Sequence, residues 1–545
     1  MKPVQILLIT VLLLGALALQ VAAQSEGGMM NFSTEYATWS ISQEGTCMSL
    51  LDKATEQDYA AQPAAPIAVA RVAGKDWPAT SAIYDQGKLT VGFGESGVKM
   101  VLGLRERTHY VLAQVISVQG EEIEQLTFVD FATRLAGIPE ELFSVCALAL
   151  NLQTNVLLLP GQMTRLQAIC YPRFGLVGAK VALIACPTTE LRNVMKEAVT
   201  DAPDLPHSPI GGPWALDAPG NRESYFFNFG DLTEQTVDQW IELAHNLGIT
   251  QIDFHGGGSF RFGDCMPNPT MYPNGRASMK AVIDKLHAAG IKAGLHTYAH
   301  FISPDCPWIT PVPSKDLAKI STYTLTTGLG ETDLELAVDE STEQISTVVG
   351  FFIRNSLILQ VDDELMRFES ATKEAPFAFK LTERGAFGTT VATHEAGAKV
   401  HHLKQCFFLF APDGDSPLLE EVAATTADFY NECGFDMIYL DALDGEDVLG
   451  GWENAWHYGA KFTFEIVKRL NKAPIMEMST FHHHLWYVRA RMGAWDHPTR
   501  AYKTFVDLHC ESNKGCDKMF LPAHLGWWRT IMTPDFQQER TYPDD

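Results

Sequence analysis

The sequence is poor in basic residues, and it has no low-complexity tract and no Cys-x-x-Cys pair. Lys and Arg number 41 against 66 Asp and Glu, a formal net charge of −25 over 545 residues. Nucleic acids and anionic membranes are bound through clusters of Lys and Arg, so this balance argues against both as partners. Structural zinc sites need Cys-x-x-Cys pairs, and the ten cysteines form none. We expect a globular protein with a neutral or non-anionic partner.

The first residues have the pattern of a secretory signal peptide. Lys2 precedes the apolar stretch Ile6–Leu19, and the small residues of Val21-Ala22-Ala23 follow it. We therefore expect residues 1–23 to be a signal peptide cleaved near Ala23, and the protein to be secreted or periplasmic. No second apolar run is long enough to span a membrane, so we expect no membrane association after cleavage.

Export would permit disulfide bonds among the ten cysteines. Cys510 and Cys516 enclose a short loop and form the best local pair. Cys265 and Cys306 each follow a predicted strand and are a second candidate pair.

The chain is too long for one ordinary domain. Residues 30–205 alternate short apolar and polar stretches with frequent turns, which predicts an all-β domain, most simply a sandwich. After a linker rich in Pro and Gly, strands and helices alternate, and Gly ends the helices, as in a parallel sheet. The expected fold class is a β-sandwich followed by a (β/α)8 TIM barrel over residues 206–302 and 401–545. A β-rich insertion at residues 303–400 is expected after the third barrel strand.

Eight barrel strands can be placed, although the last three are short. They fall at residues 225–229, 249–255, 291–300, 437–441, 474–478, 493–496, 505–509 and 519–524. No amphipathic eighth helix follows Trp528, and a barrel normally needs one to cover its last strand. We therefore expect the barrel to be truncated at its carboxyl end.

Acidic residues and histidines stand where these strands end, and in a (β/α)8 barrel those ends form the catalytic face. Asp441 follows the apolar run of the fourth strand, and Glu477 and Asp496 lie on the fifth and sixth. Cleavage of a glycosidic bond needs two carboxyl groups that flank it, so Asp441 and Asp496 are the expected catalytic pair. Glu477 is the rival of Asp496 as acid/base. The expected substrate-binding residues at or near strand ends are Asn228, Asp253, His255, His296, Trp495 and His524.

The histidines also suggest a metal-dependent hydrolase as an alternative. His482-His483-His484 is conspicuous, but consecutive residues point in different directions on a helix and cannot all bind one ion. The His-x-His pair usual on the first strand of such enzymes is missing, because that strand offers only Asn228. We expect no metal and no cofactor.

The strand that leads to Asp441 resembles the nucleophile strand of the α-galactosidase superfamily, glycoside hydrolase clan D. Glu477, Arg491 and the run Ile291–Leu295 fit the layout of that superfamily, and the resemblance covers residues 222–302 and 401–528. It implies a nucleophile at Asp441 and an acid/base at Asp496. Tyr439 and Arg491 are further expected substrate-binding residues. Tyr439 stands where many members have Lys, and Asp253 is single where many have two Asp, so the sugar stays open.

The expected function is a secreted glycoside hydrolase that acts on an oligo- or polysaccharide with retention of configuration. Asp441 would attack the anomeric carbon, and Asp496 would protonate the leaving oxygen and then activate water, with the carboxyls about 5–5.5 Å apart. Asp253, His296 and Glu477 would hold sugar hydroxyls. A polysaccharide lyase with a His or Tyr base and a non-catalytic carbohydrate-binding protein on the same scaffold are the alternatives.

Overall fold

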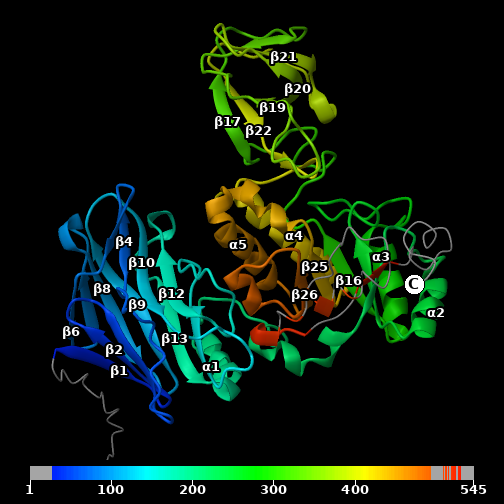
Figure 1. Cartoon of the computed structure of the whole chain (residues 1–545). Helices are drawn as coiled ribbons and strands as arrows, with labels where there is room; N and C mark the ends of the chain where they lie inside the picture. The colour runs from blue at the N-terminus through cyan, green and yellow to red at the C-terminus, as the bar shows by residue number, and fades with distance from the viewer. Residues whose placement is uncertain are drawn as a thin grey trace, which may run out of the picture.

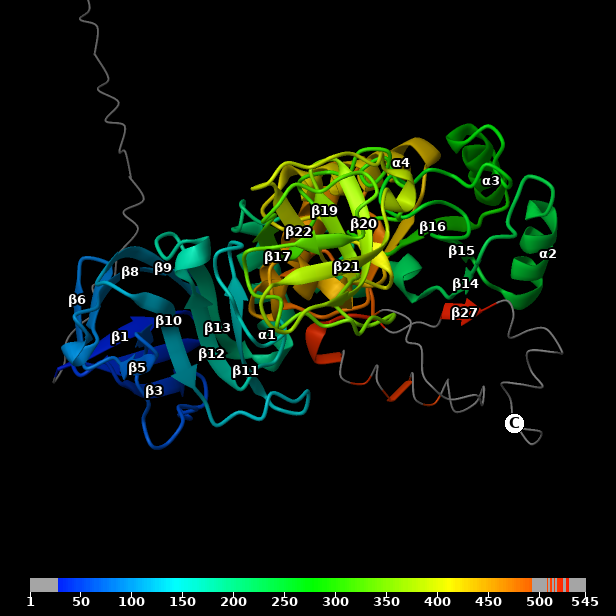
Figure 2. The same ribbon diagram turned by 90° about the horizontal axis from the view of Figure 1, so that it is seen from above.

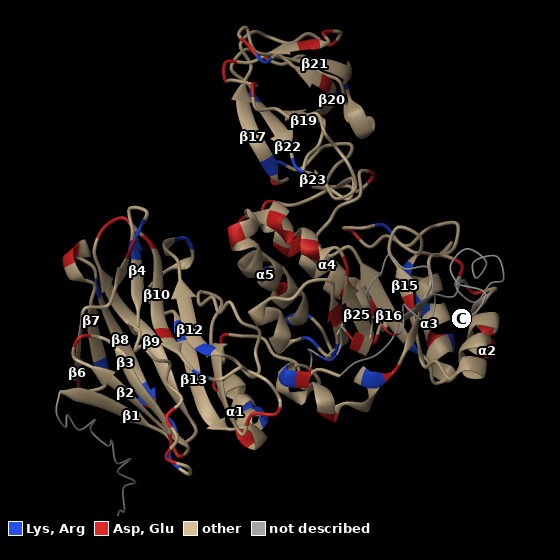
Figure 3. Cartoon of the chain, viewed as in Figure 1, with Lys and Arg blue, Asp and Glu red and all other residues tan. Residues whose placement is uncertain are grey.

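The computed structural model describes residues 28–492, 507, 510, 511, 514, 517–522 and 526–528. The described chain has an amino-terminal β part, a part built on a parallel sheet, and a β insertion (Figure 1). Acidic residues are spread over all three parts, with basic residues among them (Figure 3). None of the described helices is long and apolar enough to cross a membrane. The expected signal peptide lies outside the described residues.

The amino-terminal part consists of three antiparallel sheets followed by one helix, α1 (Thr188–Thr200). Burial alternates along strands such as β7, so one face packs against the core, while the edge strand β11 is buried along its whole length. The first sheet has the order β1 (Met29–Ser33), β2 (Ala37–Ser42), β3 (Cys47–Asp52). The second has the order β12 (Arg165–Cys170), β10 (Ile123–Ala132), β4 (Val69–Val72), β5 (Lys75–Pro78). The third has the order β11 (Phe143–Ala149), β13 (Lys180–Pro187), β9 (Tyr110–Gln119), β8 (Lys99–Glu106), β7 (Lys88–Gly92), β6 (Ser81–Asp85).

The second part is a six-stranded parallel sheet in which most neighbours in space are also consecutive along the chain. Helices connect these strands, and Gly248 and Gly434 end two of the helices in the left-handed conformation that glycine adopts without strain. The strands are β14 (Tyr225–Phe227), β15 (Gln251–His255), β16 (Lys292–Thr297), β25 (Met437–Leu440), β26 (Ile475–Met478) and β27 (Gly526–Trp528). The helices are α2 (Val237–Leu247), α3 (Arg276–Ala288), α4 (Pro417–Cys433) and α5 (Ala455–Val467).

The last described strand lies beside the first one. β27 pairs in parallel with β14, and Figure 2 shows the two side by side. The strand predicted at residues 519–524 is wrong over its described part, because Asp517–Met519 forms a 3-10 turn and residues 520–522 belong to no strand. Asp507 is helical, which also contradicts the strand predicted at residues 505–509. The strand predicted at residues 493–496 lies outside the described residues.

The insertion follows β16, as predicted, and forms a six-stranded antiparallel sheet with a hydrophobic cluster of its own. Its two ends meet at a narrow neck, where the Lys404 N–H donates to the Ala318 carbonyl and the Ala318 N–H donates to the Ala411 carbonyl, both at 2.8 Å. Figure 1 shows the module standing above the parallel sheet. Its strand order is β17 (Lys319–Thr324), β22 (Lys399–Leu403), β19 (Ile358–Val361), β20 (Glu364–Ala371), β21 (Ala378–Glu383), β18 (Glu335–Ala337).

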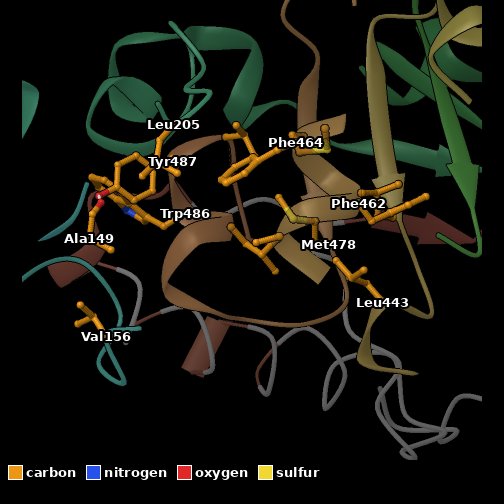
Figure 4. Packing of buried hydrophobic residues seen from close by; sticks show 14 of the residues in the cluster. Ala149, Val156, Leu205, Leu443, Phe462, Phe464, Met478, Trp486 and Tyr487 are labelled. Carbon is orange, nitrogen blue, oxygen red and sulfur yellow. Dashed lines mark hydrogen bonds between the residues drawn. The ribbon is translucent and has the colours of Figure 1, made fainter. Parts of the chain in front are cut away.

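The amino-terminal part and the parallel-sheet part share one hydrophobic core. Ala149 from β11 and Leu205 from the linker lie near Trp486 and Tyr487, which follow β26 (Figure 4). The Tyr487 hydroxyl donates to the Ala149 carbonyl across this junction. The two parts are therefore packed as one body rather than joined by a free linker.

Two of the three consecutive histidines serve this junction. His483 Nε2 accepts from the Ala149 N–H at 3.1 Å, and Nδ1 lies 2.7 Å from the Leu158 carbonyl, so the proton is on Nδ1. His484 Nε2 lies 3.1 Å from the Asn151 carbonyl. Burial lowers the pKa of His483 to about 4 and that of His484 to about 3, so both rings are neutral.

The predicted pairing of Cys265 with Cys306 is wrong, because both are buried free thiols. Cys510 is also a free thiol, and Cys516 lies outside the described residues.

Candidate active site

Polar side chains gather at the carboxyl ends of β15, β16 and β25. The register pairs His255 with His296, and His296 with Tyr439. Side chains alternate between the two faces of a strand, so Asp253, two residues before His255, lies on the same face. Asp441 follows β25 directly and stands two residues beyond Tyr439. Three neighbouring strands therefore bring all five residues to one end of the sheet.

A line of hydrogen bonds runs from a buried carboxylate to a partly exposed one. Asp253 Oδ2 lies 2.8 Å from His296 Nδ1, and His296 Nε2 lies 3.2 Å from Asp441 Oδ2. The side chains of Asp253 and His296 are 0% and 3% exposed, whereas that of Asp441 is 30% exposed. Asp441 is therefore the end of this line that a ligand can reach.

The charges of this line keep Asp441 ionised. Burial opposes a charge on His296, but the hydrogen bonds and charges of Asp253 and Asp441 outweigh it and raise the pKa of His296 to about 9. Burial also opposes the charge on Asp441. The hydrogen bond and charge of His296 and the N–H of Ala442, 2.8 Å from Oδ1, lower the pKa of Asp441 below its ordinary value. At neutral pH, Asp441 is a carboxylate with a cation at one oxygen and a backbone N–H at the other.

Asn228 holds Asp253 from the side opposite His296. Its backbone N–H donates to Asp253 Oδ1 at 2.9 Å, and its side-chain oxygen accepts from the N–H groups of Gly230 and Asp231 at 2.9 and 3.1 Å. Asn228 itself is fully buried. The structure therefore places this predicted substrate-binding residue behind Asp253, where it orients the carboxylate and the turn after β14.

His255 is a neutral acceptor beside the charged His296. Their ring centroids are 4.2 Å apart, and His255 Nδ1 lies 2.5 Å from the Gly256 carbonyl, which assigns the proton to Nδ1. Burial and the charge on His296 lower the pKa of His255 to about 3. The unprotonated Nε2 suits a hydroxyl donor such as a sugar OH.

The same residues could also hold a metal ion. His255, His296 and Asp441 each offer one ligand atom, and these atoms lie within 4.8 Å of one another. Two imidazoles and a carboxylate are a donor set that divalent first-row metals accept. His296 would have to lose its Nε2 proton to bind an ion, and its two carboxylate neighbours resist that loss. Binding of an ion by these three residues would therefore release a proton from His296.

Aromatic rings surround this polar end. The Tyr439 ring lies 4.4 Å from that of His296, and Phe227 lies 5.5 Å away on another side. Phe229, 47% exposed, lies 5.0 Å from the ring of His255. Tyr439 was predicted as a substrate contact, while Phe229 was not singled out, although it directly follows Asn228 at the end of the first strand.

Glu477 and Arg491 form an ion pair inside the sheet rather than at its open end. Both side chains are fully buried, and Arg491 Nε donates to Glu477 Oε1. The Tyr225 hydroxyl donates to the other oxygen, Oε2, at 3.2 Å. Arg491 also donates to Gln251 Oε1 at 2.9 Å and to the Glu223 carbonyl at 2.8 Å. One oxygen of Glu477 is therefore engaged by Arg491 from the chain after β26, and the other by Tyr225 at the start of β14.

A second buried carboxyl group lies in the turn after β25. Glu446 is 2% exposed and contacts His482 Nε2 through Oε1. Burial raises the pKa of Glu446 to about 7. A Cβ at Gly459 of α5 would lie 1.6 Å from Glu446 Oε2, so any larger residue there would displace the Glu446 carboxyl group. Sequence analysis did not single out Glu446, and the glycine inside α5 is the sequence signal that marks a close approach to this helix.

Three predicted site residues, Trp495, Asp496 and His524, lie outside the described residues. Their roles stay predictions.

No protein-family model and no curated protein matches this chain. A GH36 α-galactosidase from Geobacillus stearothermophilus is 9% identical, with a TM-score of 0.48 over 94% of this chain and 84% of that one. An α-galactosidase from Lactobacillus brevis is 10% identical, with a TM-score of 0.43 over 94% and 82% of the two chains. An α-N-acetylgalactosaminidase from Bifidobacterium bifidum is 10% identical, with a TM-score of 0.41 over 87% and 80%. These scores are too low for the likeness to support an argument about this chain.

Proposed function

We propose that this protein is a glycoside hydrolase with Asp441 as its nucleophile. The observation that carries the proposal is the line Asp253–His296–Asp441, which ends on a partly exposed carboxylate held ionised by a buried imidazolium. A retaining glycosidase needs such a carboxylate, oriented and charged before the sugar arrives. The sheet is proposed to close into a (β/α)8 barrel, because β27 lies beside β14 at one edge and the chain between β26 and β27 is long enough to supply the missing strands.

The proposed reaction has two displacement steps. Asp441 Oδ attacks the anomeric carbon, the bond to the leaving oxygen breaks, and an acid delivers a proton to that oxygen. Water, deprotonated by the same acid/base, then cleaves the glycosyl ester and regenerates the Asp441 carboxylate. Asp496 is the proposed acid/base. Glu477 is proposed as a structural ion partner, because Arg491 and Tyr225 engage both its oxygens.

The surrounding residues have proposed binding roles. His255 Nε2 and the exposed oxygens of Asp441 face a ligand that donates hydroxyl protons. The exposed ring of Phe229 suits the apolar C–H face of a pyranose, while the buried ring of Tyr439 packs against His296. The amino-terminal sequence supports secretion, and an oligo- or polysaccharide is the proposed substrate.

The first experiment is turnover of a panel of aryl glycosides that vary in sugar and anomer. We expect at least one to be hydrolysed, and Asp441→Asn to lower kcat/KM by about 10⁴-fold or more, the scale found when a nucleophile is removed. Asp444→Asn is the matched control, because Asp444 lies three residues away and its Oδ1 bonds to Ser479 rather than to His296. It should stay within a few-fold of the wild type.

Chemical rescue distinguishes a nucleophile from a residue that merely binds. With Asp441→Gly and azide, we expect an activated aryl glycoside to give a glycosyl azide of inverted configuration. Full activity of Asp441→Asn would exclude the proposed role. Turnover that depends on added divalent metal and is lost with a chelator would favour the metal-dependent hydrolase. Unsaturated product from a uronate polymer would identify a lyase, and sugar binding without turnover would identify a binding protein.

A further inference from the structure

The insertion and the hairpin that follows it carry a group of exposed aromatic side chains. Phe351 and Phe352 of the insertion and Phe408 of the hairpin are 42%, 64% and 57% exposed, and we refer to these three as the aromatic shelf. The ring centroids of Phe351 and Phe352 are 5.0 Å apart, and those of Phe351 and Phe408 are 6.2 Å apart. Large apolar side chains are normally exposed singly, and a contiguous exposed group marks a binding surface.

The loop that carries most of the shelf is held in place without a ligand. The Asn355 side-chain amide donates to the carbonyls of Ser346 and Val348 at 2.9 and 3.0 Å, which closes the loop on itself. The Phe407 N–H donates to the Phe351 carbonyl at 2.7 Å. A surface ordered in advance loses less conformational entropy on binding, which favours affinity.

Two connections join the shelf to the candidate site. Arg354 donates to Asp447 Oδ1 and to the Asp444 carbonyl, both at 3.1 Å, and so fixes the loop to the turn that begins at Asp441. A series of ring contacts forms the second connection. The centroid distances from Phe352 to Phe407, from Phe407 to Tyr298, and from Tyr298 to His255 are each 5.7 Å. The shelf is therefore joined to His255 through a series of packed rings, of which Phe407 is buried.

The apolar side chains of the shelf favour an apolar ligand over a sugar. Phenylalanine offers no hydroxyl or N–H to a sugar, and three exposed aliphatic residues, Val348, Val349 and Ile353, flank the rings in the same loop. Ser346 and Thr347 are the exposed polar residues at the start of this loop. Aromatic sites for sugars combine a ring face with polar groups, whereas the side chains of the shelf and its three aliphatic neighbours offer none. We propose that the aromatic shelf binds an apolar aglycone, an alkyl or aryl group attached to the sugar that Asp441 attacks. The inference rests on the proposed function and specifies its substrate class.

The test compares two substrates that differ only in the aglycone. The sugar identified by the aryl panel is supplied as methyl and as octyl glycoside, below the micelle concentration of the latter. The two alkoxide leaving groups are similar in basicity, so the ratio of kcat/KM values reports binding of the chain. We expect the octyl glycoside to be favoured roughly tenfold, a small part of what full burial of seven methylene groups would supply. Phe352→Ser/Phe408→Ser should abolish this preference and leave turnover of the methyl glycoside within a few-fold.

Leu334→Ser is the matched control, since Leu334 is 52% exposed in the same insertion but outside the shelf. It should keep the octyl preference. Hydrolysis of both glycosides at equal kcat/KM by the wild type overturns this inference and leaves the proposed function intact. A preference kept by the double variant also overturns it.

A binding measurement tests the aromatic shelf even if the protein hydrolyses no glycoside. If no glycoside is hydrolysed, calorimetry with octyl glucosides and octyl galactosides of both anomers tests the shelf directly. Binding that is lost in the double variant supports an apolar ligand site, and no binding overturns the inference. The shelf could instead be covered by a second copy of this chain. Sedimentation of the wild type and of the double variant tests this, and a wild-type dimer that dissociates in the double variant overturns the inference.

Discussion

At the scale of single residues, His296 controls the charge of the proposed nucleophile. It donates hydrogen bonds to Asp253 and Asp441, and its raised pKa keeps it positive across neutral pH. The same interactions lower the pKa of Asp441, so the nucleophile loses its charge only in acid. His296→Gln keeps a hydrogen-bonding side chain and removes the positive charge.

We therefore expect the acid limb of the kcat/KM profile to move to higher pH in His296→Gln, by about one unit, as for a carboxylate that loses an opposite charge. The sign follows from linkage: a carboxylate whose pKa rises is protonated, and inactive, at a pH where the wild type still works. The measurement is the pH dependence of kcat/KM on the best aryl glycoside. His287→Gln on α3 is the control and should leave the acid limb in place. An unshifted acid limb in His296→Gln would contradict the proposed charge coupling.

The polar strand ends of this site were predictable, and their partners were not. Asp253, His296 and Asp441 stand where apolar strand runs end, and parallel strands bring such ends together. Glu477 has the same signal on β26, but alternation shows only which face a side chain takes. Arg491 comes from the chain after β26 and neutralises Glu477. This contact depends on tertiary packing, which the local sequence does not encode.

At the scale of elements, Asp436 joins three segments of the parallel-sheet part just before β25. Its Oδ2 accepts from the Ala293 N–H at 2.9 Å and lies 2.7 Å from His287 Nε2. Lys472 donates to Oδ1 at 2.7 Å. Burial opposes the charge of this carboxylate, but these hydrogen bonds outweigh burial and lower the pKa of Asp436 to about 2.

We expect Asp436→Asn to lower stability at pH 7 by about 2 kcal/mol, the value of a pKa lowered by nearly two units. A depressed carboxylate pKa contributes stability above the unfolded-state value near 3.8, and this contribution is lost as the pH falls towards 2. The difference between wild type and variant should therefore shrink between about pH 4 and pH 2. The urea midpoints of wild type and variant, measured from pH 2 to pH 7, test this prediction. Asp76→Asn is the control, because Asp76 is exposed. A difference that does not change with pH would show that the charge of Asp436 is not what stabilises the junction.

The order of elements was predictable where local patterns are long. The helices from α2 to α5 have apolar positions at helical spacing, and the strands from β14 to β26 are short apolar runs. β27 has only three residues, Gly526-Trp527-Trp528, too few for a period to appear. Met519 and Leu521 suggested a strand through their apolar character, but Asp517–Met519 turns instead and buries Met519 in the core.

At the scale of the whole molecule, the insertion is a module attached through a narrow neck. Its own cluster includes Leu336, Leu359, Phe368 and Phe379, which pack between its sheet and its loops. The two ends of the module meet where the Lys404 N–H donates to the Ala318 carbonyl at 2.8 Å. This contact is the one that closes a two-residue hairpin turn, so a short turn can replace the whole module.

We expect a chain in which Asn-Gly replaces residues 319–403 to fold, because the parallel sheet and the Asp253–His296–Asp441 line lie entirely outside the removed segment. Its thermal midpoint should fall, since Ile358 and Leu365 also contribute to the main core. Hydrolysis of a methyl glycoside should persist, while any preference for an octyl aglycone should disappear with Phe351 and Phe352. Thermal unfolding followed by circular dichroism measures the midpoint, and kcat/KM for the methyl and octyl glycosides measures activity and preference. The control is the wild-type chain with Asn-Gly inserted after Gly74, in an exposed loop of the amino-terminal part. It tests the effect of the inserted turn alone. A chain that cannot fold without the module would show that the insertion is part of the core that holds Asp441 in place, rather than a wall added to a complete site.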